Sequence, residues 1–485
     1  MIKSKIEIHD KFSVVINVTY DTIFKKKRSK YTTITYLFFA DTLNINSKTY
    51  PATKFYNDVR LFLKYDAPKY TLNDINIEED SLFKKLINNT EKFIKDESVK
   101  NNTHYKEQVK MFAATLSSLI SKEIDSLIRK KEVSPDDITS FLEKIDSILL
   151  KFRSHVVFTV KESTIKEKNK NAIFYADEHI SNVVELQLMK LFIYLQNNKF
   201  KSLILNKVVN LINSEQNYKK QKGYDSPKDK NINPEELLFK RNQLKKYIDS
   251  VFFLKQDIRK DGAVFEQTLL ALAAGLAMIF STGIAFYYQQ VYGNFTLPFF
   301  IALVVGYMLK DRIKGFFGSL FMSKSNNLFY NYKINITNSL GKRVGSIKEV
   351  FSFAPYKKLN EKIKKYRQID LIVKSDSESL NEHVIQYKKK IEIYPEKFGN
   401  DLPDEKIIGL TDSTRLNFHR FIQYMDNPKK EYILIKKGEV YNKIANKIYH
   451  INIIQKYYTE EGIEFNRYRV IMNRNGIRRI EKISL

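Results

Sequence analysis

The sequence predicts an α+β membrane protein: an N-terminal cytosolic domain of β-strands followed by helices, a two-helix transmembrane hairpin, and a C-terminal β-rich α+β cytosolic domain. Three observations lead to this fold class. Residues 267–309 form one uncharged, apolar stretch in a chain of which 28% of the residues are charged. Both ends of the chain show the period-two alternation of half-buried strands, whereas residues between about 73 and 213 show helical periodicity.

Residues 1–70 are predicted as the β-rich part of the N-terminal domain. Apolar residues alternate with more polar ones in two runs, at 12–20 and 32–38, which are separated by a basic turn at 25–30. Such alternation is typical of strands with one buried face.

Residues 71–213 are predicted as the helical part of the same domain. One helix start is sharp, because Ser134 can cap a helix whose first turn holds Pro135, Asp136 and Asp137. A long helical segment is expected from about 172 to 212. The polar residues 214–233 show no periodicity and predict a linker. Asn233 and Pro234 then open a predicted juxtamembrane helix over 234–262.

The stretch 267–309 predicts a transmembrane hairpin with spans at 267–288 and 294–309. Residues 268–288 give 21 consecutive uncharged positions, and a span needs about 20. The second span is shorter, so it needs either residues from the loop side or Lys310 and Arg312 extending their charged ends toward the interface. No ionisable residue lies inside either predicted span, which disfavours an ion-coupled transporter.

The charges around the hairpin predict its orientation. Basic residues flank both spans, and the connecting loop carries no charge, so both termini are expected in the cytoplasm and the loop outside. The protein is thus predicted as a multi-pass protein of the cytoplasmic (inner) membrane of a bacterium. The expected membrane-interface residues are Arg259, Lys260, Tyr287, Tyr288, Tyr292, Lys310, Arg312 and Lys314.

Small residues recur along both spans and predict close helix packing. They are Ala273, Ala277, Ser281 and Ala285 on the first span, and Ala302 and Gly306 on the second. Two interpretations stay open: the two spans pack on each other, or the stripe holds neighbouring subunits together.

Residues 310–329 are predicted as a juxtamembrane segment and residues 330–485 as the C-terminal β-rich domain. A helix is expected near 404–425. The chain then closes with three predicted strands at 447–458, 463–473 and 477–483, the last two joined at Asn475-Gly476, a sequence typical of hairpin turns.

The amino-acid composition limits the classes of binding partner that are expected. The formal net charge is +27, with 47 basic and 35 acidic residues before position 267 and 35 basic and 20 acidic residues after position 309. For a protein held at the cytoplasmic leaflet, anionic lipid headgroups are the nearest counter-charge. Homo-oligomerisation and a protein partner are expected as well, whereas the absence of any nucleic-acid-binding motif disfavours nucleic acid. There is no Cys, hence no disulfide and no thiolate metal site.

No catalytic, cofactor-binding or metal-binding residue is assigned from the sequence. The metal-spaced His pairs, phosphate loops and nucleophile elbows that would indicate such sites are absent. Asp177, Glu178 and His179 are adjacent but diverge on a helix, which favours a surface or packing role. We therefore expect a sensor, effector or scaffold that works by protein association, such as a bacterial stress or antiviral-defence effector that perturbs the membrane. A membrane-tethered enzyme and an oligomeric pore are the alternatives.

Overall fold

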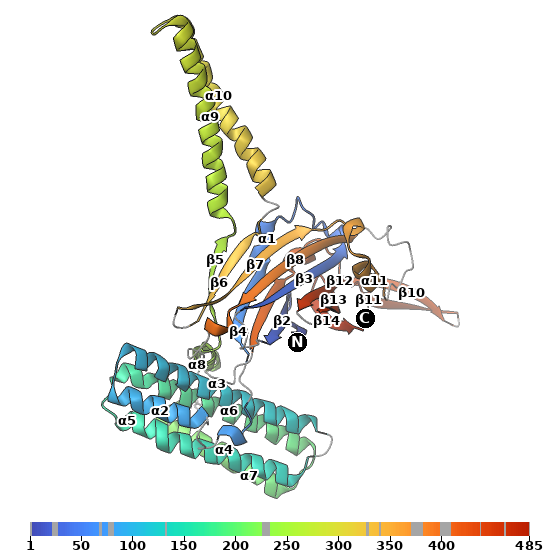
Figure 1. The fold of residues 1–485 in the computed structure, drawn as a ribbon. Helices are drawn as coiled ribbons and strands as arrows, with labels where there is room; N and C mark the ends of the chain where they lie inside the picture. Colours follow the sequence, from blue (N-terminus) through green and yellow to red (C-terminus); the bar gives the residue numbers. More distant parts are fainter. Residues whose placement is uncertain are drawn as a thin grey trace. The chain divides into compact units, whose positions relative to one another are not determined.

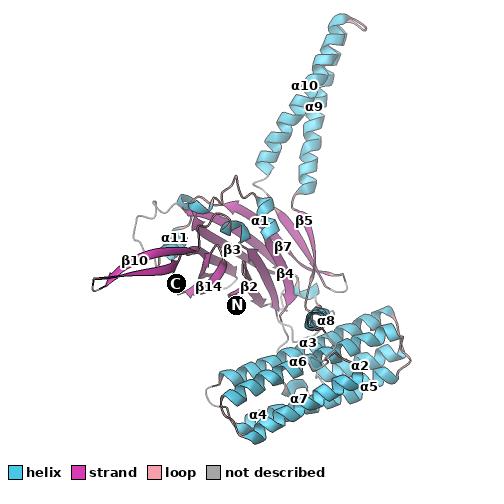
Figure 2. Ribbon diagram, turned by 180° about the vertical axis from the view of Figure 1, so that it is seen from behind, coloured by secondary structure: helices cyan, strands magenta, loops and turns pink. Residues whose placement is uncertain are grey.

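The computed structural model is a mixed α+β structure whose chain divides into two compact units (Figures 1 and 2). Unit 1 holds residues 1–62, 255–397 and 412–485, and unit 2 holds residues 63–254 and 398–411. The structure describes residues 2–21, 28–66, 70–75, 82–130, 133–225, 233–325, 329–338, 341–369, 382–397, 409–436, 438–459 and 462–484.

Unit 1 is built on an eight-stranded antiparallel sheet in the order β14-β13-β12-β3-β8-β7-β6-β5. Its strands are β3 (Ser29–Ala40), β5 (Lys255–Lys260), β6 (Tyr332–Thr337), β7 (Arg343–Phe353), β8 (Glu382–Ile393), β12 (Tyr449–Thr459), β13 (Gly462–Asn473) and β14 (Gly476–Ile483). The last three confirm the three strands predicted at the C-terminus. The turn between β13 and β14 lies one residue earlier than predicted, because Asn473 pairs with Gly476.

A four-stranded sheet, in the order β1-β2-β9-β4, lies against it. Its strands are β1 (Ile2–Ile8), β2 (Ser13–Asp21), β9 (Gly409–Asn417) and β4 (Val59–Tyr65). Hydrogen bonds join the two sheets, from Ser4 to Gln455 at 2.9 Å and between Tyr20 and Thr33 at 3.0 Å. The core between them includes Val14, Ile16 and Val18 of β2, as the alternation in this region predicted.

The prediction of separate N-terminal and C-terminal β domains is wrong. β3 pairs with β8 along its whole length, from Ser29 opposite Ile393 to Ala40 opposite Glu382, and on its other side with β12. Strands from both ends of the chain therefore form one sheet. Alternation identifies a strand but carries no information on its partner, so the sequence could not reveal this pairing.

The remaining elements of unit 1 are short or peripheral. They are η1 (Asp41–Leu43), α1 (Ala52–Asp58), η4 (Tyr356–Lys358), α11 (Glu361–Gln368), η5 (Pro395–Lys397), α12 (His419–Ile422) and a two-stranded ribbon of β10 (Lys429–Lys436) and β11 (Glu439–Asn446). Ile363 of α11 joins a buried cluster with Phe38, Val384 and Ile454 on the large sheet. The helix predicted near 404–425 is not formed where the structure describes it: residues 409–417 are strand β9, and only 419–422 are helical.

Unit 2 is a bundle of helices. They are η2 (Asn73–Ile75), α2 (Leu82–Lys95), α3 (Val99–Arg129), α4 (Pro135–Phe152), the π-helical turn η3 (Arg153–Val157), α5 (Phe158–Glu162), α6 (Glu167–Asn197), α7 (Ser202–Lys222) and α8 (Pro234–Asp249). The predicted start of α4 is confirmed, since the Ser134 side chain accepts a hydrogen bond from the Asp137 backbone amide at 3.0 Å. Asn233 caps α8 in the same way.

The linker predicted at 214–233 is wrong for its first nine residues, because α7 continues to Lys222. Here the side of the helix that faces the bundle is itself polar, with Glu215, Gln216 and Lys219 buried. Hydrophobic periodicity cannot reveal a helix whose buried face is charged. Residues 226–232 lie outside the described part of the chain.

The juxtamembrane helix predicted over 234–262 is also shorter than expected. α8 ends at Asp249, and residues 255–260 form the edge strand β5, which pairs with β6. β5 is mostly exposed, so its side chains show no alternation, and only the backbone pairing makes it a strand. Gly262 then precedes the helix that begins at Ala263 and has a φ of 75°, and the ring of Phe329 lies where a β-carbon on Gly262 would have to be.

Two long helices, α9 (Ala263–Tyr292) and α10 (Leu297–Ser325), run antiparallel to each other (Figure 1). Within the described residues, α9 is the one helix that is long and apolar enough to cross a membrane. α10 begins near the predicted second span but continues through most of the segment predicted as juxtamembrane. Its uncharged part is only 297–309.

Candidate functional site

The predicted stripe of small residues lies between α9 and α10. Ala273 and Ala277 are fully buried, although α9 is otherwise mostly exposed. A β-carbon on Gly306 would come within 3.4 Å of the Ser281 hydroxyl oxygen. Ala302 is buried too, whereas Ala285 is only partly buried. In this structure the stripe thus packs the two helices together; whether it also serves contacts between subunits stays a prediction.

The loop end of the hairpin carries the predicted aromatic residues. Tyr288 stacks on Tyr292 with ring centroids 5.7 Å apart, and Tyr287 is exposed beside them. An apolar groove of about 460 Å³ opens between the helices here. It is lined by Ile284, Tyr288, Leu297, Pro298, Ile301, Ala302 and Val305. Close packing along the stripe therefore ends near Ala285.

The predicted basic flanks lie at unequal depths along the hairpin. Arg259 and Lys260 are on β5, before α9 begins, and Lys260 forms an ion pair with Glu266 at 2.6 Å. Lys310, Arg312 and Lys314 instead lie midway along α10. The Lys310 ammonium sits 4.3 Å from the centre of the Tyr307 ring.

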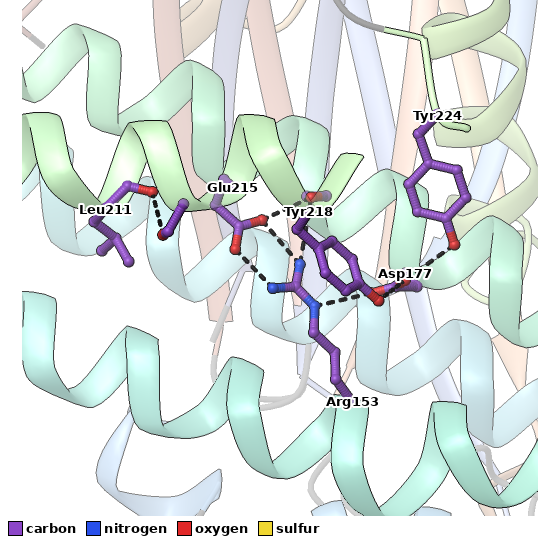
Figure 3. Close-up of polar contacts among 8 residues, drawn as sticks. Arg153, Asp177, Leu211, Glu215, Tyr218 and Tyr224 are labelled. Atoms are coloured by element: carbon purple, nitrogen blue, oxygen red, sulfur yellow. Dashed lines mark hydrogen bonds and ion pairs between the residues drawn. The ribbon is translucent and has the colours of Figure 1, made fainter. Parts of the chain in front are cut away.

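Sequence reasoning missed a buried polar network in unit 2, centred on Arg153 (Figure 3). The Arg153 guanidinium donates two hydrogen bonds to the Glu215 carboxylate, at 2.7 and 2.8 Å, and one to Asp177 at 3.3 Å. It also stacks over the Tyr218 ring at 3.6 Å. Asp177 in turn accepts hydrogen bonds from the hydroxyls of Tyr218 and Tyr224, at 2.7 and 3.0 Å. The π-helical turn η3 begins at Arg153.

A second network continues one turn further along α6 and α7. Lys219 is fully buried and donates to Asn182 and Glu185, each at 2.8 Å. Burial alone would raise the pKa of Glu185, but the hydrogen bond and charge of Lys219 hold it below its usual range. For Asp177 the balance is opposite, since burial raises its pKa despite Arg153.

A signal for these networks was present in the sequence. Asp177, Ser181 and Glu185 recur every four residues on α6, and Glu215 and Lys219 do so on α7, which places each set on one helix face. All three members of the 177–179 cluster are buried, so a packing role describes them better than a surface role. Burial and the nearby Lys245 lower the pKa of His179 to about 4.

Unit 1 holds a third polar cluster between its two sheets. Lys389 of β8 forms a buried ion pair with Asp412 of β9 and donates to the Thr414 hydroxyl at 2.8 Å. Nearby, the Tyr387 hydroxyl donates to the buried Glu349 carboxyl at 2.6 Å. Burial raises the pKa of Glu349 to about 7, although Tyr387 and Lys389 oppose the shift.

Within each of these three clusters, the charged groups bond to one another. The described residues contain no group of three or more His, Asp or Glu side chains placed to hold a metal ion. Their geometry is suited to fixing helices and sheets in register, which buried ion pairs do when each partner is satisfied. No protein-family model, no curated protein and no solved structure matches this chain.

Proposed function

We propose that the protein is anchored in the bacterial cytoplasmic membrane by the α9–α10 hairpin and acts through association, as a sensor, effector or scaffold. The observation that carries this proposal is where the hairpin is inserted. It connects β5 and β6, which are adjacent antiparallel strands paired from Lys255 opposite Thr337 to Lys260 opposite Tyr332. A hairpin whose two ends return to neighbouring strands leaves both flanking chain segments on the same side of the membrane.

The distribution of charged residues then indicates on which side of the membrane the two termini lie. The 293–296 loop has no charged residue, and the chain outside the hairpin is strongly basic on both sides. The positive-inside rule supports cytoplasmic termini. In that orientation the excess of Lys and Arg faces the anionic lipid headgroups of the inner leaflet, which supports a contribution of lipid binding to the anchoring.

The β10–β11 ribbon supports association. Every residue of both strands is exposed, and a two-stranded ribbon alone is marginally stable in water. The pairing of Ile435 with Val440, and the alternation along each strand, put four aliphatic residues on one face. These are Ile433, Ile435, Val440 and Ile444, with 63–74% of their surface exposed. Such a face suits a second copy of the chain or another protein.

A stress or antiviral-defence effector that perturbs the membrane on assembling is the form of this function that we favour. A membrane-tethered enzyme is the second candidate, because a carboxyl with a pKa of about 7, such as Glu349, could exchange protons near neutral pH. The satisfied hydrogen bonds of the buried clusters support association over catalysis.

Topology reporters test the anchoring. A reporter fused after Leu485 should be active in the cytoplasm, and one inserted at Gly293 should be active outside. Salt alone should leave the protein with the membrane, and detergent should extract it. Extraction by salt alone, or two reporters active on the same side, would contradict the proposal.

A further inference from the structure

The middle of α10 carries four consecutive or nearly consecutive charged residues, Lys310, Asp311, Arg312 and Lys314, which we call the charged band. Apolar residues lie on both sides of it. Residues 297–309 precede the band without any charge, and 315–321 follow it with Phe316, Phe317, Leu320 and Phe321. The band is therefore an interruption within an apolar helix and not its end.

Contacts with α9 fix the depth of the charged band. On one side of the band Gly306 lies against Ser281, and on the other side Gly318 lies against Leu270. The band thus lies opposite the part of α9 between Leu270 and Ser281. That part is the centre of the uncharged stretch 267–288 of α9, the one helix among the described residues that is long and apolar enough to cross a membrane.

Three of the four residues of the charged band point away from α9, whereas Lys310 is partly buried and lies one turn after Gly306. Ala302, Gly306 and Gly318 form the buried side of α10, whereas Asp311, Arg312 and Lys314 are exposed. Their charges consequently face whatever surrounds the hairpin. Charged side chains that face lipid at the centre of a span are strongly unfavourable.

Placing the charged band at the inner membrane surface would keep its charges out of the lipid, but the lengths and the apolar residues of the hairpin do not fit that placement. The 13 residues 297–309 are only about 20 Å long, and the hydrocarbon core is about 30 Å thick. The apolar residues beyond the band would also be left in water. On α9 these include Val264, Phe265 and Leu272, and on α10 they include Phe316 and Leu320, all of them exposed on the hairpin.

We propose that copies of the hairpin assemble with their charged bands facing a shared water-filled pathway, and that this pathway selects small inorganic anions. The inference rests on the proposed membrane-spanning hairpin and names what its assembly would conduct. Water in the pathway hydrates the charges, so their burial among lipids is avoided. Each copy contributes two exposed cationic groups, Arg312 and Lys314, and one exposed anionic group, Asp311, and rings of Lys and Arg favour anions.

Reversal potentials test the selectivity. Full-length protein is reconstituted into planar bilayers under a KCl gradient, and the wild type should pass chloride in preference to potassium. The double variant Arg312→Glu, Lys314→Glu should shift the reversal potential toward potassium. Lys255→Glu, an equally basic and exposed position on β5, should leave it unchanged. Selectivity that the double variant does not alter, or a wild type without conductance, would overturn the pathway.

Thiol labelling gives an independent test that does not depend on charge reversal being tolerated. The chain contains no Cys, so single substitutions report one position each. In liposomes, Arg312→Cys should react with a membrane-impermeant anionic thiol reagent and lose current, whereas Leu272→Cys, which is exposed on α9, should not react. Equal protection of both positions would overturn the pathway. If the protein floats with the liposomes but fails both tests, the pathway is refuted and the membrane anchoring stands. If it does not float with the liposomes, both the anchoring and the pathway are refuted.

Discussion

The helical unit and the α9–α10 hairpin both place charged side chains among apolar helices, and they treat these charges in opposite ways. In unit 2 Arg153 and Lys219 point inward to carboxylates of the same chain. On α10 Arg312 and Lys314 point outward, away from α9. A charge that is satisfied within the chain serves the fold. In the proposed membrane-spanning arrangement, a charge turned outward from α10 needs water or a neighbouring copy beside it.

Removing the Arg153 guanidinium should give the largest loss of stability in the helical unit. Arg153→Met leaves Asp177 and Glu215 buried without their cation, which typically costs about 3–5 kcal/mol. We expect faster hydrogen exchange throughout α6 and α7 in the full-length protein. Lys190→Met is the matched control, since its ion pair with Asp125 is exposed and should contribute at most about 1 kcal/mol. Equal effects of the two substitutions would refute a structural role for the network.

In the interior of unit 1, the buried carboxyl of Glu349 should make the stability of the fold depend on pH. Its pKa rises from 4.5 to about 7 on folding, so between these values the folded state binds more protons than the unfolded state. Stability should consequently fall as pH rises through this window, by roughly 3 kcal/mol for this group. Glu349→Gln should flatten the dependence of the denaturant midpoint on pH between 5 and 8. An unchanged slope in the variant would show that Glu349 is ionised throughout.

Within the hairpin, Ala277 lies on the inward side of α9, where it meets α10. Ala277→Leu inserts bulk into a fully buried position and should destabilise the helix pair by about 1–3 kcal/mol. We expect a lower melting temperature and yield in detergent. A reduced oligomeric mass at unchanged stability would instead assign the stripe to contacts between subunits.

The β10–β11 ribbon should show the smallest effect on stability. Ile433→Thr together with Ile444→Thr keeps β-branched side chains on the strands, and both positions are exposed, so stability should change by about 0.5 kcal/mol or less. Association, measured as mass or as cross-linking yield, should decrease. If mass and cross-linking are retained, the ribbon does not hold the assembly together.

Local signals in the sequence predicted local structure well. The cap at Ser134, the start at Pro234 and the last three strands all depend on neighbouring residues, and each is present. Features that depend on distant partners could not be predicted. β5 is a strand only because β6 pairs with it, and α7 extends to Lys222 because Lys219 and Glu215 find partners on other helices.

The same limit applies to the site. The uncharged stretch indicated the hairpin and the small residues indicated its contact face. The uncharged, apolar stretch ends at Leu309, so hydropathy does not predict the second half of α10. That half depends on α9 as a packing partner. The charged band therefore appeared in the sequence as a flank, whereas in the structure it lies beside the middle of α9.

The position of β3 in the centre of the large sheet has a consequence for biosynthesis. Its neighbours β8 and β12 begin at Glu382 and Tyr449, so a ribosome must translate more than 300 further residues before β3 can pair. At about 5–20 residues per second this takes on the order of tens of seconds. During that interval the helical unit and the hairpin have already emerged, while β1–β3 wait with open edges. A chaperone that shields nascent strands should therefore matter more for the yield of this protein than for that of a chain whose strands pair in sequence order.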